Sequence, residues 1–155
     1  MNKRNRIILP AACILLAVAL SACQSGGATP EEQRAMASLT PAERDRVGRL
    51  TIQKLRSEGW KETRDVRIRD IRYRSSDNTF VYDIVAKNYS DVRKVSPQYR
   101  RQAEQEFKNG MRRDTCRNAA MRDLLVYGRY AVEYRIYVDN GKMLAAPVRI
   151  TGRDC

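Results

Sequence analysis

The stretch Tyr130-Ala-Val-Glu-Tyr-Arg-Ile-Tyr-Val138, followed by Asp139-Asn140-Gly141, decides the fold. Apolar and polar side chains alternate along it with a period of two, which is the pattern of a half-buried strand. Asn-Gly is a strong signal for a tight hairpin turn. Residues 143–151 supply the returning strand, in which Pro147 marks an edge or a bulge. The stretch therefore predicts an antiparallel hairpin.

A second hairpin is predicted upstream, with strands at residues 66–74 and 79–86 around the turn Ser75-Ser76-Asp77-Asn78. The alternation in the first of these strands slips by one residue near Arg69-Asp70, which indicates a β-bulge.

Helices are expected before each hairpin. Thr29-Pro30-Glu31-Glu32 and Thr40-Pro41-Ala42-Glu43 are capping boxes that open helices at about 30–38 and 41–57. Ser96-Pro97 opens a longer helix, which Gly110 should break or bend before a further piece at about 113–127. The order helix, hairpin, helix, hairpin predicts an α+β fold, a small antiparallel sheet of two hairpins with helices packed on one face.

The N-terminal segment has the form of a targeting signal. Basic residues near the start precede an apolar run at 7–20, which is short for a bilayer span of about 20 residues. The run ends in Leu20-Ser21-Ala22-Cys23, which resembles the lipobox of bacterial lipoproteins. That resemblance implies cleavage after residue 22 and acylation of Cys23, with palmitate among the acyl chains. A plain signal peptide cut at the same bond is the alternative.

The lipobox also sets the predicted domain boundaries. Residues 1–22 are the lipoprotein signal peptide, 23–39 are the lipidated N-terminus and a flexible linker, and 40–155 are a single α+β domain. Gln24 takes the place of the Asp that retains enterobacterial lipoproteins at the inner membrane. Resemblance to those lipoproteins therefore favours an outer-membrane protein whose domain faces the periplasm.

Two cysteines, Cys116 and Cys155, remain after cleavage and acylation. In an oxidising compartment they are expected to form a disulfide. A pair of reactive thiols is the alternative, but no CxxC motif or neighbouring His supports it.

The chain is strongly basic and has no His: 30 Lys and Arg stand against 18 Asp and Glu, for a net charge of +12. Four arginines on one predicted strand form a candidate basic surface: Arg67, Arg69, Arg72 and Arg74. They would bind phosphate or carboxylate groups, although the bulge is expected to split them between the two faces. The alternative is a solvated strand face paired to Asp65, Asp70 and Asp83. Nucleic acid is not expected as a partner in the envelope.

No pattern of catalytic residues is recognisable. Without His the usual general base is missing, zinc sites need several Cys or His, and no glycine-rich phosphate loop occurs. We expect no enzymatic activity, no metal and no cofactor.

Residues 60–155 resemble the small β-type pilotin lipoproteins of type II secretion systems. The pattern that carries the resemblance is Tyr99-Arg100-Arg101-Gln102, Cys116, Met121 to Gly128, Tyr134-Arg135-Ile136, Asn140-Gly141 and Cys155. The chain departs from that family in its extra capped helices and its high Arg content.

The resemblance implies a protein-transport function, in which the domain binds the C-terminal segment of a secretin by helix-in-groove recognition and carries it to the outer membrane. The expected function is thus a non-enzymatic adaptor or assembly factor that binds a secretin or another envelope protein. The alternative is a basic envelope lipoprotein that binds an anionic glycopolymer or lipopolysaccharide.

Overall fold

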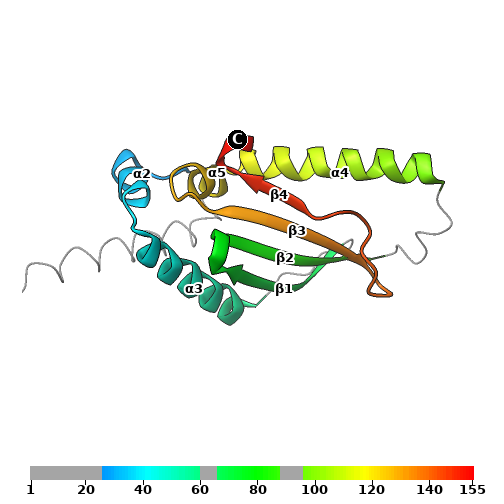
Figure 1. The fold of residues 1–155 in the computed structure, drawn as a ribbon, viewed down its shortest axis with the longest axis horizontal. Coiled ribbons are helices and arrows are strands. Elements are labelled where there is room, and N and C mark those ends of the chain that lie inside the picture. The colour runs from blue at the N-terminus through cyan, green and yellow to red at the C-terminus, as the bar shows by residue number, and fades with distance from the viewer. Residues whose placement is uncertain (1–25, 60–65, 88–95) are drawn as a thin grey trace, which may run out of the picture.

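The computed structural model describes residues 26–59, 66–87 and 96–155, without the side chains at positions 99, 100 and 103. Its centre is a four-stranded sheet in the order β1-β2-β3-β4 (Figure 1). The strands are β1 (Val66–Arg74), β2 (Thr79–Ala86), β3 (Ala131–Val138) and β4 (Val148–Thr151). β1 pairs antiparallel with β2, as β3 does with β4, which confirms both hairpins. The hairpins meet in a parallel pairing of β2 with β3, so the sheet is mixed, and the prediction that it is antiparallel throughout is wrong.

The parallel junction follows from the long connection between the hairpins. Parallel neighbours need a crossover connection that returns the chain to the same end of the sheet. Residues 87–130 make this connection and contain α4 (Pro97–Arg117) and α5 (Ala119–Val126).

The predicted helix starts are confirmed at α2 (Pro30–Ala37) and α3 (Pro41–Glu58), which both begin with the expected capping boxes. The predicted break at Gly110 is wrong, because α4 continues through it to Arg117. A glycine costs a helix interior only about 1 kcal/mol, which packing overrides. The break falls at Asn118, whose side-chain oxygen accepts a hydrogen bond from the Met121 N–H at 3.0 Å and so caps α5.

The last strand is shorter than predicted. Met143 contributes only an isolated bridge to Tyr137, and β4 starts at Val148. Pro147 has no N–H to donate to a ladder, and the Ala146 N–H donates to Glu104 Oε1 of α4 at 3.0 Å instead of to β3.

The core lies between one face of the sheet and the helices, which confirms the predicted α+β arrangement. Each strand contributes side chains to it, and α2, α3, α4 and α5 all pack against them. The buried members of this cluster are Met36, Leu39, Val47, Ile52, Ile71, Phe80, Leu125, Tyr130, Val132, Val148 and Ile150.

The packed domain begins earlier than residue 40. Met36 and Leu39 are buried in the core, and the Ala28 N–H donates to the buried Asp123 carboxylate at 2.7 Å. Most of the segment assigned to a flexible linker is therefore part of the domain. Residues 1–25, with the predicted leader and the lipidation site Cys23, lie outside the described residues.

Candidate binding surfaces

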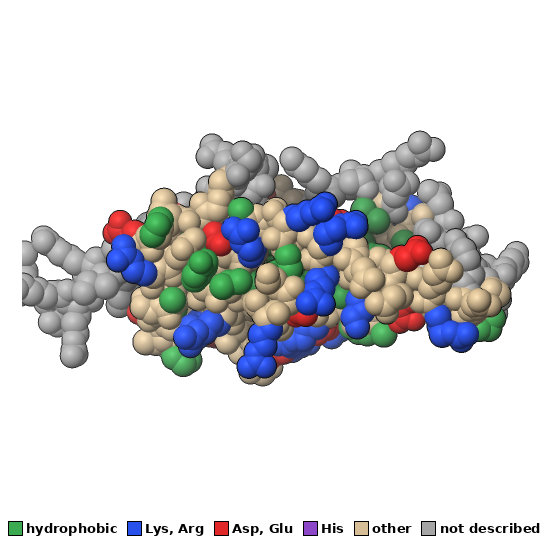
Figure 2. Space-filling model, turned by 90° about the horizontal axis from the view of Figure 1, so that it is seen from above, with side chains coloured by type: hydrophobic (Ala, Val, Ile, Leu, Met, Phe, Trp, Pro, Cys, Tyr) green, Lys and Arg blue, Asp and Glu red, His purple; other side chains and the backbone are tan. Residues whose placement is uncertain are grey.

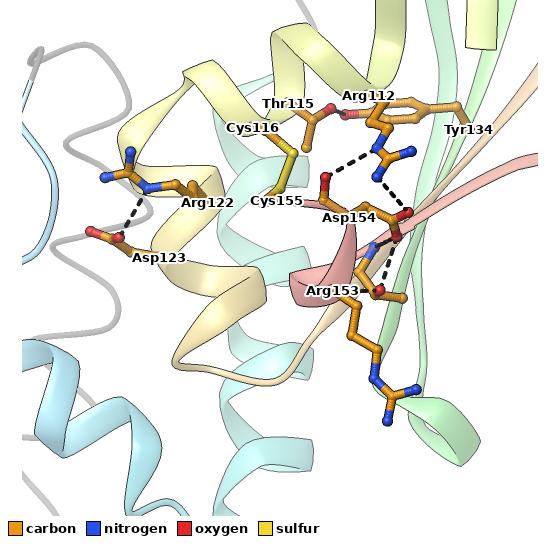
Figure 3. The surroundings of a disulfide bond; sticks show 10 residues. Arg112, Thr115, Cys116, Arg122, Asp123, Tyr134, Arg153, Asp154 and Cys155 are labelled. Atoms are coloured by element: carbon orange, nitrogen blue, oxygen red, sulfur yellow. Dashed lines mark hydrogen bonds and ion pairs between the residues drawn. A yellow bond between two sulfur atoms is a disulfide. The ribbon is translucent and has the colours of Figure 1, made fainter. Parts of the chain in front are cut away.

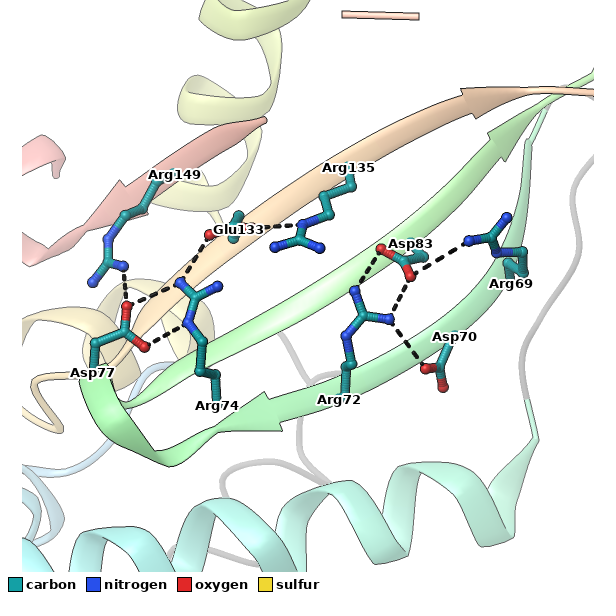
Figure 4. Close-up of polar contacts among 9 residues, drawn as sticks. All are labelled: Arg69, Asp70, Arg72, Arg74, Asp77, Asp83, Glu133, Arg135 and Arg149. Carbon is teal, nitrogen blue, oxygen red and sulfur yellow. Dashed lines mark hydrogen bonds and ion pairs between the residues drawn. The ribbon is translucent and has the colours of Figure 1, made fainter. Parts of the chain in front are cut away.

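The face of the sheet opposite the core carries a network of arginines and carboxylates (Figure 4). Among the described residues, the helices contribute to the core on the other side of the sheet. We call this network the charged face. Its members are Arg69, Asp70, Arg72, Arg74, Asp77, Asp83, Glu133, Arg135 and Arg149.

Asp83 on β2 organises one half of the charged face. Its two oxygens accept hydrogen bonds from the Arg72 guanidinium at 2.5 and 3.1 Å, and Arg69 lies 3.8 Å away. Asp83 is only 1% exposed. A buried carboxylate is costly unless it is paired, so these contacts fix Arg72 and satisfy Asp83 together.

Arg74 organises the other half and reaches from β1 across β2 to β3. It donates to Asp77 at 2.8 and 2.9 Å and to Glu133 at 2.9 Å. Glu133 also accepts from Arg135 at 2.7 Å, and Asp77 accepts from Arg149 of β4. Each carboxylate therefore bridges two arginines, so that three arginines share two carboxylates within this half.

The pairing keeps these carboxylates ionised. The hydrogen bond from Arg74 lowers the pKa of Asp77, and Arg149 adds to the effect against the opposing effect of burial. Burial alone would raise the pKa of Glu133, but hydrogen bonds from Arg74 and Arg135 outweigh it, so that this pKa is also lowered.

The structure brings most of the predicted basic surface together. A register shift between Ile68 and Asp70 confirms the bulge, but the expectation that it splits the arginines is wrong. Arg69 and Arg72 both contact Asp83 on one face, because the extra residue restores the alternation after the slip. The pairing with Asp70 and Asp83 is observed; Asp65 lies outside the described residues.

The remaining predicted member, Arg67, is exposed and forms no ion pair with a described residue. Arg69, in contrast, stacks on Tyr137, with its guanidinium carbon 4.4 Å from the ring centre.

Glu133 and Arg135 were not predicted from the sequence as members of the charged face. Their spacing of two on a strand was a usable signal that they share a face.

The predicted disulfide is present and joins Cys116 of α4 to Cys155 after β4 (Figure 3). Two contacts support it. Arg112 Nε donates to the Asp154 carbonyl at 3.0 Å, and the Thr115 and Tyr134 hydroxyls lie 3.0 Å apart. These links fix α4 against the end of the sheet.

A second surface surrounds α5, and we call it the α5 surface. It consists of four exposed arginines and one exposed apolar side chain: Arg117, Arg122, Arg129, Arg153 and Val126. Gly152 packs against Leu125 and Val126, which brings Arg153 next to α5. Figure 2, seen from the side of α4 and α5, shows basic side chains distributed along the molecule with fewer acidic ones among them.

Large exposed apolar side chains are few among the described residues. They are Val66 at 39%, Val126 at 41% and Met143 at 42%, and they lie on three separate elements. The described part of the surface thus has no cluster of such side chains to line a broad apolar groove.

Two further properties concern only the described residues. They contain no group of three or more His, Cys, Asp or Glu arranged to hold a metal ion. None of their helices is long and apolar enough to cross a bilayer.

Comparison with known proteins supports the fold. The chain matches no protein-family model and no curated protein. It is similar to the crystal structure of a protein of Pseudomonas aeruginosa described as secreted, with a TM-score of 0.55 and 13% identity over 77% of this chain and 98% of that one. At this identity the likeness concerns the fold alone. The description of that protein is compatible with the extracytoplasmic location that the leader predicts.

Proposed function

We propose that this protein is a lipid-anchored envelope adaptor of pilotin type. In this proposal Cys23 is acylated, the domain faces the periplasm from the outer membrane, and it binds a protein partner such as the C-terminal segment of a secretin. The observation that carries the proposal is the internal pairing of arginines with carboxylates on the charged face. Arg72 and Arg74 are already held by Asp83, Asp77 and Glu133.

A self-paired face favours a protein partner over a polyanion. A polyanion would have to displace the buried carboxylates from their arginines, and breaking a buried pair is strongly unfavourable. A protein segment can instead hydrogen-bond to the exposed groups at the periphery of the charged face and leave the existing pairs in place. Arg69 stacked on Tyr137 offers the residue types that are enriched at the energetic centres of protein interfaces.

The alternative function is the binding of an anionic glycopolymer or lipopolysaccharide. The observation that favours it is the set of exposed arginines outside the charged face, on α4, α5 and the segments around them. Such binding depends on charge and weakens as salt screens it.

The test is affinity capture of the full acylated protein from detergent-solubilised envelopes, followed by mass spectrometry at low and high salt. We expect a secretin that stays bound at high salt. The variant Arg69→Ala/Tyr137→Ala should weaken its capture about tenfold or more. The matched control Arg101→Ala/Gln105→Ala, two exposed residues of α4, should leave capture unchanged. Loss of every partner at high salt would instead support polyanion binding.

A further inference from the structure

We propose that the α5 surface docks on the anionic phospholipid headgroups of the membrane to which the protein is tethered. The inference rests on the proposed acylation of Cys23, and adds to it a defined orientation of the domain. Three observations carry it: where the chain joins the domain, how short the tether is, and which charges surround the junction.

The junction lies directly on α5. The Ala28 N–H donates to Asp123 Oδ2 at 2.7 Å, and a Cβ on Gly27 would meet Asp123 and Ala119. Arg122 occupies the next exposed position of the same helix, three residues after Ala119. The tether therefore leaves the domain beside Arg122.

The tether is too short to hold the domain far from the bilayer. From Cys23 to Gly27 a fully extended chain covers at most about 14 Å, at roughly 3.5 Å per residue. Electrostatic screening acts over about 8 Å at physiological ionic strength. The tether therefore holds the junction within about two screening lengths of the headgroups whenever Cys23 is anchored.

The charges around the junction suit an anionic surface. Acidic groups on these segments are engaged: Asp123 is buried beside Arg122 at 3.7 Å, and Asp154 pairs with Arg112 at 3.6 Å. The exposed Glu31 of α2 opposes the attraction but is matched by Arg34 on the same helix. The other exposed arginines of the α5 surface, Arg117, Arg129 and Arg153, are left to meet phosphate, and the exposed Val126 among them can enter the headgroup layer.

The experiment uses the full acylated protein in vesicles of phosphatidylcholine alone or mixed with phosphatidylglycerol. An environment-sensitive fluorescent amino acid is placed at position 126, and in a matched protein at position 143. Met143 is equally exposed but lies in the turn after β3, at the far end of the sheet from α5 (Figure 1). Spin-labelled headgroups then report contact by quenching.

We expect quenching at position 126 only with phosphatidylglycerol and low salt, and none at 143. The variant Arg117→Gln/Arg129→Gln/Arg153→Gln leaves the Arg122–Asp123 contact intact. It should reduce the ratio of docked to undocked protein about a hundredfold, at about fivefold per arginine. The control Arg67→Gln/Arg101→Gln/Lys142→Gln carries the same change of charge on exposed residues remote from α5 and should dock normally.

Equal quenching at the two positions, or quenching at position 126 that ignores phosphatidylglycerol or the three arginines, overturns the proposal. So does competition by inorganic phosphate beyond its effect on ionic strength, because the site would then bind free anions. Failure of the proposed anchor gives a different result. In that case the protein washes off vesicles of both compositions.

Discussion

On β2 the two faces of the sheet are buried to a similar degree by different chemistry. Phe80 and Val81 are neighbours on β2 and each is 2% exposed, yet they point to opposite faces. Phe80 packs in the core beneath the helices. Val81 lies in register between Arg72 and Glu133 on the charged face. Paired arginines and carboxylates can thus close a sheet surface as helices do.

The difference lies in how each face responds to change. Apolar burial is non-directional and scales with area, so the core should lose stability in proportion to the volume removed. On the charged face a complete pair adds little, whereas a broken buried pair is costly. Stability on that face should therefore depend on charge and on pH.

Phe80→Ala should have the largest effect, because it removes a buried aromatic ring from the core. We expect a loss of roughly 3–5 kcal/mol in the free energy of unfolding, measured by urea denaturation. Val132→Ala in the core and Val81→Ala on the charged face are the matched pair, because the two side chains are 0% and 2% exposed and the same groups are removed; the core variant should lose more. Equal losses would contradict the distinction between the two faces.

Loss of the disulfide tests the covalent support on the core side. Cys116→Ser/Cys155→Ser should lower the free energy of unfolding by about 4 kcal/mol, because the bond closes a loop with a sequence separation of 39 residues. The unmodified protein in reductant should match the variant in denaturation experiments. A variant as stable as the oxidised protein would show that the helices alone fix α4.

Asp83→Asn removes the charge of the buried carboxylate that pairs with Arg72 on the charged face, and it keeps the shape of the side chain. We expect a loss of about 2 kcal/mol in thermal or urea denaturation, since Arg72 is 39% exposed and water replaces part of the contact. Asp70→Asn, at a carboxylate whose side chain is 36% exposed, should cost less than about 1 kcal/mol. A larger loss in the Asp70 variant than in the Asp83 variant would contradict the role that we give to Asp83.

Glu133→Gln should have the smallest effect at neutral pH, about 1 kcal/mol, and a clear effect on the pH dependence. The folded-state pKa values of Glu133 and Asp77 are lowered from ordinary values of 4.5 and 3.8. Their stabilisation is therefore complete above these ordinary values and is lost as pH falls through the lowered ones. Melting temperatures measured from neutral to acid pH should fall less steeply for the variant, and parallel curves would contradict the assignment.

Local signals in the sequence predicted most elements of the fold. Thr29 and Thr40 cap their helices through residues three positions away, and the slip at Arg69 marks the bulge within one strand. The break after α4 was also local, because Asn118 is a favourable N-cap, but Gly110 was the more conspicuous residue.

Long-range pairings could not be predicted in this way. The alternation on β3 shows that Glu133 and Arg135 share a face, but not that β3 lies beside β2. Only the parallel junction brings Glu133 within reach of Arg74 on β1. The arginines of the candidate surface were identified from the sequence, whereas the partners that neutralise them depend on strand order.

The parallel junction also has a consequence for folding kinetics. Each hairpin can form from residues that are close in sequence, but joining β2 to β3 requires closure of the whole segment 87–130. For such non-local contacts, the chain loses conformational entropy before any stabilising contact forms, and this slows folding. We expect the two hairpins to form early and their union to limit the rate, so that the exposed edges of β2 and β3 are the vulnerable surfaces of the newly synthesised chain.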